Sequence, residues 1–232
     1  DIIEKILEVY MDKLKIVFFF FIIIFSFMVN ASNLQELFKK ADELWKQRSD
    51  IEKAKEVIKV LEEILSIDPN QAEAYWKIAR AYYWIGDSEK NNDKKLNYFK
   101  EGIEYAKLGV ELNPNIAETH FWLAVSYSKY GETKGILQSL HLLPYIRKEL
   151  DEVIKINPSC ESGGAYRVHG RIYYKLPSFK GGSNEKSEEY LKKAIELGPN
   201  NLMNYRFLAE TYWAMGKKKE AIDLLKKVIE MP

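Results

Sequence analysis

The sequence predicts an all-α protein, a right-handed superhelix of about five helix-turn-helix pairs with extended turns inside the pairs. Three observations predict this fold. A helical phrase that stops at proline recurs, as "EEILSIDPN", "LGVELNPN", "DEVIKINPS" and "KAIELGPN". Each copy is followed by an aromatic phrase, "AYWKIARAYYWIG", "THFWLAVSYSKYG", "GAYRVHGRIYYKL" or "NYRFLAETYWAMG". No low-complexity segment or interdomain linker interrupts the series.

The prolines divide the chain into units. They stand at intervals of 45, 44, 41 and 33 residues, at Pro69, Pro114, Pro158, Pro199 and Pro232. Because proline removes a backbone donor and clashes with the preceding turn, each should follow the end of a helix. The first pair, Leu34 to Arg48 and Ile51 to Ile67, has the weakest pattern because no glycine separates its helices.

Small residues and tyrosines alternate in the first helix of each later pair. A small residue lets the two helices approach, and a tyrosine three positions later fills the gap. The small residues are Ala79, Ala124, Gly170 and Ala209, and the tyrosines are Tyr82, Tyr127, Tyr173 and Tyr212. We expect Gly86, Gly131 and Gly216 to end first helices in the left-handed conformation that glycine adopts cheaply.

Three units exceed the last one by about ten residues, between their two helices, as "DSEKNNDKKLN", "ETKGILQSLHL" and "LPSFKGGSNEK". The glycine pair in "FKGGSN" could be a phosphate-binding loop or a turn. It lacks the GxxxxGK[ST] pattern and a preceding strand, which favours a turn. Ser183 or Asn184 should then cap the following helix.

Residues 1–31 are predicted to be a signal peptide, and residues 32–232 the repeat domain. The apolar run from Ile16 to Val29 follows two lysines and has 14 residues, fewer than the roughly 20 that a spanning helix needs. Cleavage is expected after Ala31, and residues 1–10 can be an upstream extension because Met11 precedes the charged stretch. The alternative is an uncleaved segment that anchors the domain to a membrane.

Composition excludes some functions. The 35 basic and 34 acidic residues are balanced, so nucleic-acid binding, which needs a basic excess, is not expected. Cys160 is the single cysteine, so the chain forms no internal disulfide, and we expect the thiol to be partly buried. His120, His141 and His169 lack ligand-spaced partners and are expected to be structural. No catalytic residue, metal or cofactor is predicted.

A candidate binding surface follows from the geometry of stacked pairs, in which one face of each first helix lines an inner wall. The wall is aromatic and arginine-rich, which is typical of binding hot spots. Its predicted residues are Trp76, Arg80, Tyr83, Trp84, Phe121, Val125, Ser128, Arg167, Arg171, Tyr174, Arg206, Glu210 and Trp213. For Tyr83 and Trp213, packing between pairs is an equally good interpretation.

These patterns resemble the tetratricopeptide repeat (TPR), a unit of 34 positions that the last stretch, "NLMNYRFLAETYWAMGKKKEAIDLLKKVIEMP", matches almost throughout. Three longer phrases, "HFWLAVSYSKYGETKGILQSL", "YRVHGRIYYKLPSFKGGSNEKSEEYLKKAIELGPNNL" and "FLAETYWAMGKKKEA", are similar to the T component of periplasmic TRAP-type transporters. The most specific elements are Lys134-Gly135-Ile136, Leu176-Pro177 and Gly181-Gly182. The chain departs from that family by lacking its lipid-bearing cysteine.

The resemblance implies a periplasmic, non-catalytic scaffold that binds a solute-binding protein or its hydrophobic or organic-acid ligand, in some members as a homo-oligomer. Two alternatives stay open. One is a periplasmic carrier that holds an acyl chain among Trp76, Trp84 and Trp213 with its carboxylate on the arginines. The other is a general protein-interaction module unrelated to transport.

Overall fold

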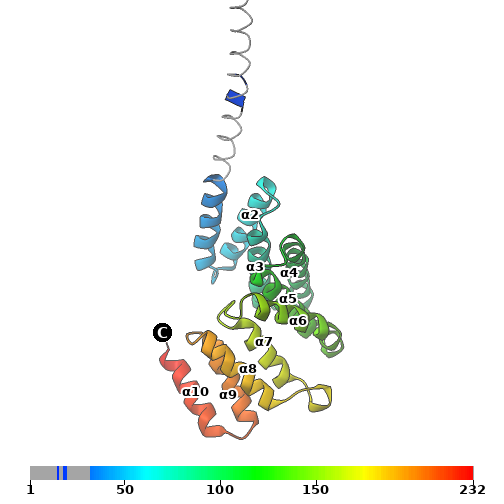
Figure 1. The fold of residues 1–232 in the computed structure, drawn as a ribbon, viewed down its shortest axis with the longest axis vertical. Coiled ribbons are helices and arrows are strands. Elements are labelled where there is room, and N and C mark those ends of the chain that lie inside the picture. Colours follow the sequence, from blue (N-terminus) through cyan, green and yellow to red (C-terminus); the bar gives the residue numbers. More distant parts are fainter. Residues whose placement is uncertain (1–14, 16–17, 20–31, 232) are drawn as a thin grey trace, which may run out of the picture. The chain divides into compact units, whose positions relative to one another are not determined.

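The computed structural model describes residue 15, residues 18–19 and residues 32–231 of the chain. It consists of two compact units, Asp1–Gln71 and Ala72–Pro232. Every regular element in the described ranges is a helix, and the helices follow one another in pairs, which confirms the predicted fold class (Figure 1). The predicted signal peptide and its cleavage site lie, apart from three residues, outside the described residues. Among the helices that are described, none combines the length and the apolarity needed to cross a membrane.

The first unit contains the predicted first pair. A helix covers residues 32–46, and α2 (Ile51–Ile67) follows after a short turn. The side chain of Asp50 accepts a hydrogen bond from the backbone N–H of Glu52 and so caps α2. One face of α2 is buried through Val57, Leu61 and Ile64. The amphipathic pattern was therefore sufficient to locate this pair.

The second unit contains four helix pairs. Its first helices are α3 (Ala72–Ser88), α5 (Ala117–Lys134), α7 (Gly164–Lys175) and α9 (Leu202–Ala214). Their partners are α4 (Asn92–Leu112), α6 (Ile136–Ile156), α8 (Asn184–Leu197) and α10 (Lys218–Glu230). A short 3-10 helix, η1 (Ser178–Lys180), lies between α7 and α8.

Small residues allow close approach within the pairs, as predicted. Ala79, Ala124 and Ala209 are almost completely buried. At Gly170, a Cβ atom would lie 2.6 Å from Cγ of Leu191 on α8, so only glycine fits there.

Two of the three predicted helix-ending glycines have another role. Gly216 has φ +77° and ends α9 as expected, but Gly86 and Gly131 lie inside α3 and α5. A Cβ at Gly86 would lie 2.7 Å from the ring of Phe99, and one at Gly131 would lie 3.0 Å from Cα of Ser139. For these two glycines the prediction is wrong, because they provide space for the partner helix instead of a left-handed turn.

Most of the additional residues in the long units lengthen helices. Both α4 and α6 have 21 residues, and the connection from α5 to α6 is reduced to Gly135, with φ +120°. Only the fourth pair has a longer connection. There the "FKGGSN" segment forms η1 and a turn, and Ser183 caps α8 by accepting a hydrogen bond from the N–H of Lys186. The prediction of a capped turn is confirmed.

The core of the second unit lies between α5 and α6 and extends to the start of α7. It contains large apolar side chains such as Phe121, Leu150 and Val153. Cys160 is buried in the same cluster, 2% exposed, and burial raises the pKa of its thiol well above the usual range. The thiol was predicted to be partly buried, and it is almost completely buried.

Candidate functional site

The four first helices of the second unit contact one another in succession, α3 with α5, α5 with α7 and α7 with α9. We call the surface that they form the first-helix face. Every residue predicted to bind a partner lies on one of these helices, but the residues differ in exposure and in the contacts that they make.

On α3, Trp76 and Arg80 form one contact. The guanidinium of Arg80 lies 4.9 Å from the centre of the Trp76 ring, a cation–π arrangement along one side of the helix. Both side chains are half-buried, as is that of Trp84 one turn further on. This end of the first-helix face is therefore aromatic and positively charged.

Tyr83 packs between helices. The centre of its ring lies 5.4 Å from that of Trp122 on α5. The ammonium of Lys129 lies 5.9 Å from the centre of the Tyr83 ring. Lys129 also pairs with Asp87 at 2.8 Å. Burial is the main reason why the pKa of Tyr83 is raised. These contacts place Tyr83 at the packing interface between α3 and α5.

On α5, the predicted residues contribute little surface. Phe121 is 2% exposed and belongs to the core, where its ring meets the ring of Trp122 edge-on at 5.2 Å. A Cβ at Gly164 would come within 2.5 Å of the Phe121 ring. Val125 and Ser128 are half-buried, and the Ser128 hydroxyl donates to the carbonyl of Ala124. Phe121 therefore supports the first-helix face from the core, and its side chain is not accessible to a partner.

Arg167 on α7 has a structural role. It donates hydrogen bonds to the carbonyl oxygens of Glu161 and Ser162 and to Oδ1 of Asn204 on α9. Glu161 and Ser162 have φ values of +49° and +57°, which cost energy for residues with a side chain. Fully buried Asn204 in turn donates to the carbonyls of Ser162, Ala194 and Gly198. Arg167 and Asn204 thus hold the left-handed turn before α7.

Arg171, Glu210 and Arg206 form a shared ion pair between α7 and α9. Nη1 of Arg171 lies 2.5 Å from Oε2 of Glu210, and Nε of Arg206 lies 3.2 Å from Oε1 of the same carboxylate. The Arg171 guanidinium is also 4.9 Å from the centre of the Tyr174 ring and 4.5 Å from that of Phe207. Two cations share one anion here, which leaves one positive charge uncompensated within the cluster.

The exposed part of the first-helix face lies beside this cluster. The Arg206 side chain is 59% exposed and Trp213, two turns further along α9, is 56% exposed. The ammonium of Lys218 lies 5.6 Å from the centre of the Trp213 ring. An exposed tryptophan on the same helix as an exposed arginine is typical of a binding hot spot. Of all the predicted binding residues, Arg206 and Trp213 are the most accessible.

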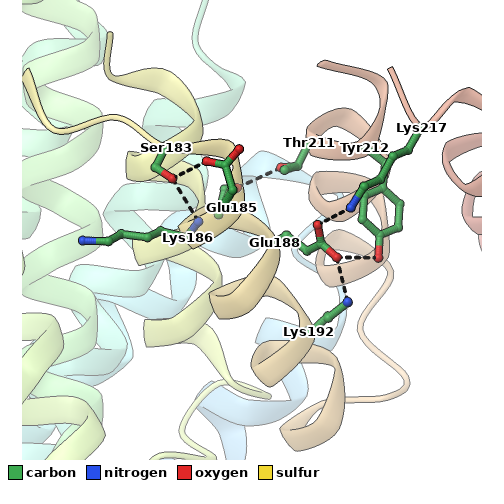
Figure 2. A network of polar contacts seen from close by, with 9 residues as sticks. Ser183, Glu185, Lys186, Glu188, Lys192, Thr211, Tyr212 and Lys217 are labelled. Carbon is green, nitrogen blue, oxygen red and sulfur yellow. Dashed lines mark hydrogen bonds and ion pairs between the residues drawn. The ribbon is translucent and has the colours of Figure 1, made fainter. Parts of the chain in front are cut away.

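A polar network fixes α9 and the start of α10 against α8. Glu188 on α8 pairs with Lys192 at 2.7 Å and with Lys217 at 2.6 Å, and it accepts a hydrogen bond from the hydroxyl of Tyr212 (Figure 2). These pairings lower the pKa of Glu188, although partial burial opposes the effect. The network holds the helix that carries Arg206 and Trp213.

Four residues that matter for this surface were not predicted. Trp122 donates its indole N–H to Glu161, and Asn204 holds the left-handed turn. Lys129 and Phe207 contact predicted residues. Their partners lie 37 to 42 residues away or on a different helix, so the sequence gives no sign of these contacts. It shows only that the four residues lie on the same first helices.

Two of the three histidines, His120 and His169, have structural surroundings, whereas His141 is exposed. Nδ1 of buried His120 lies 2.5 Å from Oε2 of Glu149, and its Nε2 lies 2.9 Å from the carbonyl oxygen of Pro114. Burial opposes the charged ring, but these two acceptors raise the pKa of His120 above its ordinary value. Nε2 of His169 contacts Asp151, and burial lowers the pKa of that ring. Within the described ranges, no group of three or more potential metal ligands comes together.

The fold and this surface together define a helical-repeat protein of the tetratricopeptide class, and a model of that repeat matches residues 205–232. The model of the family "Regulator of microtubule dynamics protein 1-3" matches residues 37–180. The chain therefore belongs to the regulator of microtubule dynamics family.

Curated relatives support this assignment. Regulator of microtubule dynamics protein 1 from Pongo abelii is 26% identical over 184 residues, which are 71% of this chain and 57% of the relative. The Homo sapiens protein of the same name is 26% identical over 176 residues, 68% of this chain and 55% of the relative. The aligned part thus spans little more than half the length of these relatives.

Solved structures agree on the fold. A thermophilic TPR protein from Thermus thermophilus, TTC0263, superposes with a TM-score of 0.66 at 20% identity, over 85% of this chain and 91% of that one. MamA from Desulfovibrio magneticus RS-1 gives a TM-score of 0.55 at 16% identity, over 85% and 94%. At these identities the likeness shows the fold alone.

The comparisons correct the predicted function. A role as accessory to a TRAP-type uptake system is wrong, because the matching family and its curated relatives are regulators of microtubule dynamics. The periplasmic localisation is wrong for the same reason, since these relatives are mammalian and mammalian cells have no periplasm. Neither a solute-binding protein nor a small-molecule ligand is supported as a partner, whereas proteins of the repeat class generally bind other proteins.

Proposed function

We propose that the chain is a non-catalytic module that binds polymerised tubulin through the part of the first-helix face formed by α7 and α9. The names of the relatives support microtubules as the target. The repeat class supports a protein partner, because stacked pairs present an extended surface without a reaction centre.

The observation that carries the proposal is the Arg171–Glu210–Arg206 cluster beside exposed Trp213. Arg171 is fixed by Glu210 and by two aromatic rings, so its donors are held in place before a partner arrives. Arg206 is exposed and shares the same carboxylate, so it can turn to an acidic group of the partner at little cost. Trp213 offers a rigid apolar contact. The surface therefore fits an acidic segment that also carries an apolar side chain.

Co-sedimentation of the full chain with polymerised tubulin tests this. We expect Trp213→Ala to weaken binding by about tenfold or more, as truncation of a central aromatic residue does at hot spots. Arg206→Ala should weaken it by roughly three- to tenfold, and the loss should shrink at high salt. Glu210→Gln keeps an acceptor oxygen for Arg171 but removes the negative charge that competes with the partner, so it should strengthen binding at low salt.

Two exposed residues on partner helices serve as controls. Ile229→Ala on α10 removes a comparable exposed apolar side chain, and Lys155→Ala on α6 removes an exposed cation whose pair with Glu152 is local. Both should bind as the wild type does. If the wild type remains in the supernatant, or if all four alanine variants bind equally well, the proposal fails.

A further inference from the structure

Two turns of the second unit expose large apolar side chains. Ile136 and Leu137, at the start of α6, are 71% and 81% exposed, and Phe179 in η1 is 82% exposed. Tyr145 lies two turns after Leu137 on the same side of α6 and is 52% exposed. Such exposure costs free energy, because apolar side chains are more stable when they are removed from water.

The two turns lie on the same edge of the second unit. In stacked helix pairs, the turns between first and second helices line one edge, and Figure 1 shows the starts of α6 and α8 on the same side of the ribbon. Arg147 of α6 and Lys186 of α8 both lie over the ring of Tyr173, at 5.3 and 5.4 Å from its centre. We call residues 134–148 and 175–186, which carry these features, the turn edge.

The turn edge is positively charged. Glu185 is the one acidic residue in these two segments, and six basic residues outnumber it. The basic residues are Lys134, Arg147, Lys148, Lys175, Lys180 and Lys186. Lys134 lies two residues before Ile136, and Lys180 directly follows Phe179. A lysine therefore lies beside the exposed apolar side chains of each turn.

The two cations over the Tyr173 ring differ in accessibility. Nε and Nη2 of Arg147 are enclosed and find no hydrogen-bond acceptor in the described part of the chain. Figure 2 shows the ammonium group of Lys186 directed away from the Glu188 network. Lys186 is exposed, so its ammonium group can pair with a phosphate or carboxylate group from outside, whereas the enclosed donors of Arg147 cannot.

We propose that the turn edge docks onto the surface of an anionic phospholipid membrane. The apolar tips, Ile136, Leu137 and Phe179, enter the boundary between head groups and acyl chains, while the lysines contact the lipid phosphates. The separation of the tips on two projecting turns favours a membrane over a protein partner. A protein interface needs a continuous, well-packed patch, whereas a fluid lipid surface accommodates separate tips.

Fluorescent labelling of the full chain tests the proposal. Leu137→Cys and Phe179→Cys are each labelled with the environment-sensitive dye NBD, and Ile229→Cys, on equally exposed α10, is the control. Native Cys160 stays unlabelled because it is buried and its pKa is raised. The probes are vesicles of phosphatidylcholine with phosphatidylserine, vesicles of phosphatidylcholine alone, and nitroxide-labelled lipids as quenchers.

With phosphatidylserine present, we expect a blue shift and nitroxide quenching at positions 137 and 179, and neither effect at position 229. Removing Lys134 or Lys180 by substitution with glutamine should reduce vesicle affinity about fivefold for each lysine. The apolar run from Ile16 to Val29 is present in every variant, so attachment through it affects all probes alike.

Two results would overturn the proposal. One is a vesicle-bound protein whose probes at 137 and 179 are quenched no more than the probe at 229. The other is a blue shift at 137 and 179 without vesicles that depends on protein concentration, because a second copy of the chain would then cover the turn edge.

Discussion

His120 is a residue whose charge the structure can specify. Both ring nitrogens face oxygen atoms, the Glu149 carboxylate and the Pro114 carbonyl, which favours the charged ring because it can donate from both nitrogens. Its pKa is therefore raised in the folded state despite burial, which would by itself lower it. In the unfolded chain the pKa of the ring is about 6.5. The ion pair between α5 and α6 exists only while the ring is charged.

His120→Gln should consequently destabilise the protein in a pH-dependent way. Below pH 6.5 the full contribution of the pair is present, and its loss should lower the free energy of unfolding by about 3–5 kcal/mol. As pH rises through the raised folded pKa, the wild type loses that contribution and the difference between the proteins should shrink. Urea unfolding at several pH values measures it.

The double variant His120→Gln/Glu149→Gln is the control, since it removes the unpaired buried carboxylate and should recover part of the loss. The pKa of His169 is lowered, so its titration changes stability only at acid pH. This change is the same in the wild type and in the His120 variants. A difference that is constant from acid to alkaline pH would contradict the assigned charge.

The sequence could show that His120 occupies a packing position, but not that it is charged. Glu149 lies 29 residues away, and only the packing of α6 against α5 brings it within reach. The same limit applies to Arg167. Its spacing predicted a surface residue, while the left-handed turn at Glu161 and Ser162, which it holds, depends on backbone angles that no periodicity encodes.

At the scale of single elements, helix α3 depends on the absence of a side chain at Gly86. We expect Gly86→Ala to lower the free energy of unfolding by roughly 1–3 kcal/mol, although alanine favours helices, because Phe99 is fully buried and cannot move aside. Thermal or urea unfolding measures the change. The double variant Gly86→Ala/Phe99→Leu should be more stable than Gly86→Ala alone, and equal stability of all three proteins would exclude a steric role.

The existence and order of the helices could be predicted from the sequence, but some of their ends could not. Proline stops located the ends of α2, α4, α6 and α8 within a few residues. Gly131 looked like a helix end because polar residues follow it, yet α5 continues to Lys134. A glycine required by a neighbouring helix and one that ends a helix have the same local sequence, so only the packing distinguishes them.

For the whole molecule, stability should decrease toward the last helix. Among the residues of α10 only Ala221 is buried, and Ile222, Leu225 and Ile229 remain exposed, whereas α5 has nine buried residues. In a repeat protein each helix is stabilised mainly by its neighbours, and α10 packs on α9. Hydrogen exchange followed by mass spectrometry should show faster exchange in α10 than in α5. Equal protection of the two helices would contradict this.

The candidate site was predictable only as a surface. Repeat geometry placed its residues on the first helices, and Arg206 and Trp213 are exposed there. The identity of the partner was not predictable in this way, because an aromatic and arginine-rich wall suits many ligands. The similarity to a transporter component rested on segments at turns, where related and unrelated repeat proteins differ most freely.

The single thiol of this chain determines how the fold responds to oxidising and reducing conditions. Cys160 has no second cysteine with which to form an internal bridge, and its burial and raised pKa leave little thiolate to react. The packing of the helices, and no covalent link, holds these residues together. The fold therefore depends on no internal disulfide, and thiol reductants should leave its native state unchanged.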